Sequence, residues 1–138
     1  MKKKIFLGFV LVFIACSVLE VLEHNFLFTP EHWGAGNLFR PRSEVIFWIF
    51  PATYLVFAFF FTLIFAKWYG GGGALEGARF GLYVSLMMTL IYHFTQYAGM
   101  PIPFAMALQR VVLGTVENIV FAIILALVFG RKGNSSVG

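Results

Sequence analysis

Long apolar runs dominate the chain, and polar residues interrupt them at few positions. The first run, from Ile5 to Phe28, carries no charge until Glu20; Glu23 and His24 follow before it turns apolar again. A run of this length can cross a bilayer. Ionisable groups are costly at membrane depth and normally face a protein interior or a water-filled cavity. We therefore expect the remaining segments to supply partners for these three side chains.

Three further apolar runs follow, separated by short segments that carry turn residues. The first span covers about residues 5–28, and the later ones cover about 44–67, 74–98 and 104–129. Ser43 is a predicted N-cap for the second span, and Pro51 predicts a kink inside it. Four consecutive glycines, Gly70 to Gly73, predict a hinge or linker before the third span. Four spans with short loops predict an all-α membrane protein, a single up-down-up-down bundle over residues 1–138.

The composition excludes a soluble domain. Of the 138 residues, 60% are hydrophobic and 12% are charged, whereas soluble domains carry about 25% charged residues. The single cysteine, Cys16, excludes internal disulfides and paired-thiol chemistry. The lysines at positions 2–4 and the apolar run up to Cys16 also resemble a lipoprotein signal, but the run continues past the cysteine, which favours an uncleaved first span.

Positive residues indicate how the bundle is oriented. The formal net charge is +4, and most of it lies at the chain ends and in loops, which is typical of membrane topology rather than of nucleic-acid binding. Arg40 and Arg42 lie on one side of the membrane. The other side holds Lys2, Lys3, Lys4, Lys67, Arg79, Arg131 and Lys132. The count predicts that both termini are cytoplasmic, in the plasma (inner) membrane of a bacterium.

Small residues recur at every fourth position in the last two spans. Because lipid supplies no hydrophobic drive between helices, small residues that let backbones approach mark helix contacts. The predicted packing residues are Gly77, Gly81, Ser85, Gly114, Asn118 and Ala122. A four-residue step drifts by about 40° around a straight helix, so the pattern predicts a spiral seam.

Ionisable residues from three spans are predicted to share one level. At a rise of about 1.5 Å per residue, Glu20, His93 and Arg110 all fall in the outer third of the membrane. The candidate binding residues of this polar layer are Glu20, Glu23, His24, His93, Arg110 and Tyr97. Glu117 falls deeper, near the middle of the fourth span, and is expected to hydrogen-bond across the seam together with Asn118.

Four interpretations of this layer remain open. The groups could simply neutralise one another, as buried charges usually do. Glu20, Glu23, His24 and His93 could hold a divalent metal, although Arg110 nearby opposes a cation. A haem could bind between His24 and His93. Finally, Glu20 or Glu117 could carry a proton in a proton- or ion-coupled small-solute transporter.

Among function classes, the sequence favours a binding, transport or accessory protein over an enzyme. Nucleophilic catalysis needs Ser, Cys or Thr beside a base, and Cys16 and Ser17 lie about two turns below His24 on the same helix. The expected partner is the lipid bilayer, with a homo-oligomer or a larger membrane complex left open.

The order of short motifs resembles an uncharacterised family of small four-span bacterial inner-membrane proteins. The resemblance rests on the lysine-rich start with Gly8, the group Glu20, Glu23 and His24, Arg40-Pro41, Glu76-Gly77-Ala78-Arg79-Phe80-Gly81, Met100-Pro101-Ile102-Pro103 and Gly114-Thr115-Val116-Glu117. It implies the fold and the location, and it implies no activity.

Overall fold

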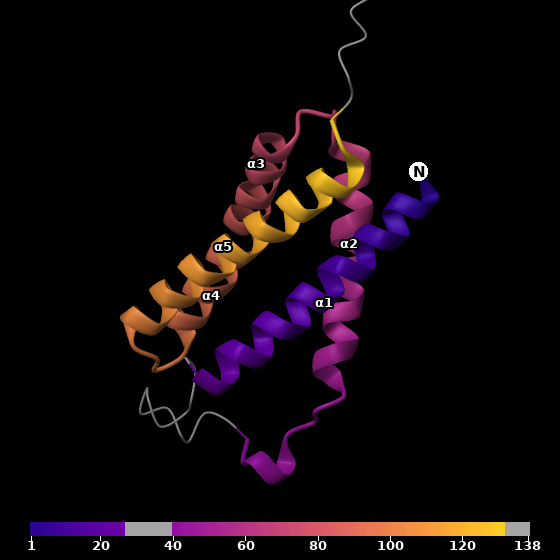
Figure 1. The fold of residues 1–138 in the computed structure, drawn as a ribbon. Helices are drawn as coiled ribbons and strands as arrows, with labels where there is room; N and C mark the ends of the chain where they lie inside the picture. The colour runs from indigo at the N-terminus through magenta and orange to yellow at the C-terminus, as the bar shows by residue number, and fades with distance from the viewer. Residues whose placement is uncertain (27–39, 132–138) are drawn as a thin grey trace, which may run out of the picture.

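Helices make up the secondary structure of the part of the chain that the computed structural model describes, residues 1–26 and 40–131 (Figure 1). The main elements are α1 (Lys2–Phe26), α2 (Ile49–Trp68), α3 (Ala74–Val84), α4 (Leu90–Gly99) and α5 (Phe104–Phe129). A π-helical segment, η3 (Ser85–Thr89), joins α3 and α4 into one rod. Within the described residues, four helices are thus long and apolar enough to cross a membrane. The chain is that of an all-helical, multi-pass membrane protein.

The second span begins later than the sequence predicted. Arg42–Glu44 forms only a 3-10 turn, Val45 is extended, and α2 begins at Ile49 with no side-chain cap. Ser43 is therefore not the N-cap of this helix. Pro51 lies in the first turn, where a backbone N–H has no helical partner to lose, so proline fits at the helix start and causes no kink inside it. The predicted kink is wrong for this reason. The predicted end of the first span, at residue 28, lies outside the described residues.

α3 and α5 pack backbone to backbone. A methyl group added at Gly77 would lie 2.7 Å from the Ala122 carbonyl oxygen, and one added at Gly81 would overlap the backbone at Asn118. Only glycine lets the two helices approach this closely, which is how small residues promote helix contact in membranes.

The π-helical segment changes the predicted course of this seam. The Leu90 N–H donates to the Ser85 carbonyl, an i to i+5 bond that widens the turn. A four-residue step normally rotates by about 40° around the helix axis. The wider π-helical turn offsets this rotation, so the small-residue face of α3 continues through η3. Thr89 consequently faces Gly114 of α5.

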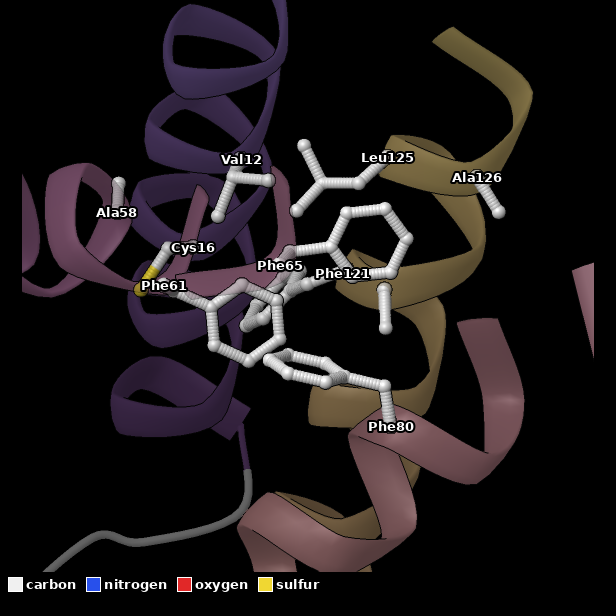
Figure 2. Packing of buried hydrophobic residues seen from close by; sticks show 10 residues of the cluster. Val12, Cys16, Ala58, Phe61, Phe65, Phe80, Phe121, Leu125 and Ala126 are labelled. Atoms are coloured by element: carbon white, nitrogen blue, oxygen red, sulfur yellow. The ribbon is translucent and has the colours of Figure 1, made fainter. Parts of the chain in front are cut away.

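Aromatic side chains fill the bundle toward the end where α1 begins and α5 ends. Phe61 and Phe65 of α2 meet Phe80 of α3 edge to face, at ring-centroid distances of 5.4 and 5.1 Å. The buried cluster in Figure 2 comprises Val12, Cys16, Ala58, Phe61, Phe65, Phe80, Phe121, Ala122, Leu125 and Ala126. On α1 the buried positions are Gly8, Val12 and Cys16. The first four turns of α1 thus contact the core, and Glu20, Glu23 and His24 lie beyond it.

The glycine-rich loop is held at the same end of the bundle. The Glu76 carboxylate accepts hydrogen bonds from the N–H groups of Gly70 and Gly72, so the loop binds a side chain of the chain itself at the start of α3. The Tyr69 hydroxyl accepts from the Gly73 N–H at 2.9 Å. Lys4 donates to the Phe129 carbonyl at 2.8 Å, which joins the beginning of α1 to the end of α5.

We predict that Gly77→Ala destabilises the bundle, because the added methyl must push apart two backbones. Overpacking of this kind costs about 1–3 kcal/mol, measured as the change in unfolding free energy in detergent. Gly99→Ala is the matched control, since a methyl at Gly99 meets nothing within 4 Å. Equal stability of the two variants would contradict the proposed backbone contact.

Candidate functional site

A small polar cavity lies between three helices. Its volume is about 80 Å³, and its lining consists of Glu20, Glu23, His24, His93, Arg110, Gly114 and Glu117. These residues come from α1, α4 and α5. Five of the six predicted members of the polar layer therefore surround one space inside the protein.

Helical spacing explains how each element presents its side chains. Glu20, Glu23 and His24 stand at i, i+3 and i+4 on α1, a spacing that places them on one helical face. On α5, Arg110 and Glu117 are separated by two turns of the helix, and Gly114 lies between them. Because Gly114 has no side chain, the space between the two charged groups stays open.

Asn118 determines which way this face of α5 points. Its amide donates to the hydroxyls of Ser85 and Thr89, both at 3.1 Å, and Ser85 in turn donates to the Gly81 carbonyl at 3.0 Å. Successive residues of a helix are separated by about 100°. With Asn118 turned toward η3, the preceding Glu117 points toward α1.

The Glu20 carboxylate has several partners. Its Oε2 lies 3.2 Å from His24 Nδ1, and the same ring nitrogen lies 3.0 Å from the Glu20 carbonyl oxygen. The Tyr54 hydroxyl of α2 also interacts with this carboxylate, and the Arg110 guanidinium attracts it from α5. These partners stabilise the ionised form of the Glu20 side chain.

Glu23 and Glu117 form a different kind of contact. Their carboxyl groups, on α1 and α5, interact directly with each other. The Glu117 Oε1 atom is buried and finds no hydrogen-bond partner among the described residues, and the same holds for His93 Nδ1. Buried polar atoms normally have a partner, so these two atoms are exceptions among the residues around the cavity.

Carboxylates outnumber fixed positive charges around the cavity. Three glutamates face one arginine, and the two histidines can be neutral or charged. When both histidines are neutral, the surplus negative charge must be offset by bound protons or by a bound cation. This surplus is the main electrostatic property of the site.

The geometry gives little support to the metal and haem interpretations. Among the described residues, which include all four proposed ligands Glu20, Glu23, His24 and His93, no group of three or more His, Cys, Asp or Glu side chains is placed to hold a metal ion. A cavity of about 80 Å³ between His24 and His93 cannot enclose a porphyrin.

Two sequence expectations differ from the structure. Tyr97 does not line the cavity; it lies 40% exposed and packs edge to face on Phe104, with ring centroids 5.6 Å apart. Glu117 is not confined to the seam, since it lines the cavity beside Glu23. The spacing of Arg110, Gly114 and Glu117 on one face of the fourth span was the signal that could have placed Glu117 in the site.

We predict that Asn118→Ala and Ser85→Ala are energetically coupled. Interhelical hydrogen bonds in membranes average about 0.6 kcal/mol and reach about 1.7 kcal/mol, so a double-mutant cycle on unfolding free energy should give a coupling within this range. Thr115→Ala is the control partner, because the Thr115 hydroxyl donates within α5 to the Val111 carbonyl. As large a coupling with Thr115 would show that the Asn118 bridge does not hold the two spans together.

Comparisons with known proteins leave the site to be interpreted from its own geometry. No protein-family model matches the chain, and neither a curated protein nor a solved structure matches it. The side chains around the cavity are therefore the basis for assigning a function.

Proposed function

We propose that the protein binds a small cationic solute in the polar cavity and exchanges it for a proton held between Glu23 and Glu117. The surplus of carboxylates over arginine around one membrane-embedded cavity carries this proposal. In the absence of the solute, the proton reduces the negative charge of the cavity. In its presence, the positive charge of the solute takes over that role.

The contact between two carboxyl groups makes Glu23 and Glu117 the proton carriers. Two carboxylates in direct contact repel each other when both are charged, so such pairs hold a shared proton. When a cation enters, this proton leaves to water and both carboxylates become anionic. One positive charge replaces another, and the net charge of the cavity does not change.

Glu20 has a different role in this proposal. Its interactions with His24, Tyr54 and Arg110 already stabilise its negative charge. Of the two proton carriers suggested by the sequence, Glu117 is therefore favoured over Glu20. Glu20 instead positions His24 and Arg110 at the edge of the cavity.

Transport also requires a membrane orientation, which we propose from charge and contacts. We place the helices in up-down-up-down order in a bacterial plasma membrane, with both termini in the cytoplasm. The Lys4–Phe129 hydrogen bond supports this arrangement because it joins the start of α1 to the end of α5. The lysines at positions 2–4 also lie at this end, as the positive-inside rule requires.

Infrared spectroscopy of the protein in lipid should detect the shared proton. We predict a protonated-carboxyl stretching band that disappears reversibly as the pH is raised, and that is absent in both Glu23→Gln and Glu117→Gln. Glu20→Gln should keep the band, because Glu20 is stabilised as an anion by its neighbours.

Glu44→Gln provides the matched control, since Glu44 is exposed and lies outside the cavity. A band that survives in both Glu23→Gln and Glu117→Gln would refute the shared proton. Loss of the band in Glu44→Gln would show that it comes from elsewhere.

Cysteine labelling tests the proposed orientation. In a Cys16→Ser background, a membrane-impermeant maleimide added to intact cells should label Glu44→Cys and should leave Arg79→Cys unlabelled until the cells are opened. Glu44 precedes α2 and Arg79 lies near the start of α3, so an up-down order places the two positions on opposite sides of the membrane. The reverse labelling pattern would invert the topology.

A further inference from the structure

An open groove lies beside the polar cavity. Its volume is about 800 Å³, within the range of about 300–1,000 Å³ that small-molecule sites occupy. The groove is lined by residues of α2, α3, η3, α4 and α5, among them Phe57, Met88, Ile91, Tyr92, His93 and Thr95.

Helix packing explains why this side of the bundle is open. α2 packs against α1 and α5, and α4 packs against α5 and η3. Figure 1 shows α2 and α4 diverging from each other toward the end of the bundle opposite the N-terminus. Met88, Ile91 and Tyr92, three of the lining residues, are 53–59% exposed on a membrane span, so the groove opens toward the surrounding lipid.

The wall of the groove is mainly apolar, with polar groups at one level. Phe57, Met88 and Ile91 offer hydrocarbon and aromatic surface. Gln96 donates to the Tyr92 hydroxyl at 2.9 Å, so these two polar side chains satisfy each other in part. Such a wall suits a hydrocarbon chain better than a polar solute.

His93 lies between the groove and the cavity, since it lines both. Its Nδ1 atom finds no hydrogen-bond partner among the described residues. The ring packs edge to face on Tyr92, with centroids 5.1 Å apart, and interacts with the Gln96 side chain, so the imidazole is the wall that the two spaces share. Displacement of this one side chain would connect the lipid side to the surplus carboxylates.

We propose that the groove takes the hydrocarbon chain of an amphiphile whose cationic head group passes His93 and enters the polar cavity. The inference rests on the proposed function and names its substrate class. Charge selects the occupant: three glutamates against one arginine attract a quaternary or protonated amine and repel the phosphate of an anionic lipid. The aromatic faces of Tyr92 and Phe57 can also attract a cation as it enters the groove.

Calorimetric titration in lipid nanodiscs, with empty nanodiscs subtracted, tests this proposal. The probes are dodecyltrimethylammonium, tetramethylammonium and dodecyl sulfate. Thr95→Trp fills the groove, and Leu108→Trp places the same side chain at an exposed position of α5 outside it. We expect Thr95→Trp to weaken dodecyltrimethylammonium binding about fivefold or more and to leave tetramethylammonium binding unchanged. Leu108→Trp should alter the binding of neither ammonium probe. Dodecyl sulfate should not bind saturably to the protein.

The probes separate failure of this inference from failure of the proposed function. If Thr95→Trp leaves dodecyltrimethylammonium binding unchanged, or if dodecyl sulfate binds as tightly, the groove proposal is overturned. If tetramethylammonium still binds and displaces a proton in that case, the cavity function stands without the groove. If neither ammonium probe binds and the infrared band is also absent, the proposed function itself fails.

Discussion

The close approach of α3 and α5 along Gly77 and Gly81 is the contact on which the rest of the structure depends. Lipid offers no hydrophobic reason for helices to associate, so packing and hydrogen bonds must hold them together. The two glycines bring the backbones into contact, and Asn118 fixes the rotation of α5 through Ser85 and Thr89. That rotation turns Arg110 and Glu117 toward α1, and the polar cavity follows from it.

The bundle divides its length between two kinds of interior. Aromatic rings from α2, α3 and α5 fill the part nearer the start of α1 and the end of α5, where α1 contributes small or apolar residues. Beyond Cys16, the side of α1 that faces the cavity carries glutamate and histidine instead. Dense aromatic packing stabilises one end without polar groups, which allows the other end to contain a cavity.

The balance of charge in that cavity limits what it can do. A single carboxylate paired with Arg110 would be electrically satisfied and chemically inert. Glu23 and Glu117 add two more carboxylates in contact with each other, and their negative charge must be offset by a proton or a cation within the membrane. The adjacent groove places an apolar surface beside these carboxylates. His93 is the only described residue with an ionisable side chain that lines both spaces.

The sequence by itself determined the helical spans, because apolar length and loop composition are local properties of the chain. It also placed Glu20, His93 and Arg110 at one depth, since helical rise is constant. The start of α2 was missed because Pro51 is compatible with both a helix start and a kink. Only the tertiary structure decided that Glu117 meets Glu23 and that Tyr97 stays outside. These outcomes depend on helix rotation and crossing, which the π-helical segment and the Asn118 bridge set through contacts between distant residues.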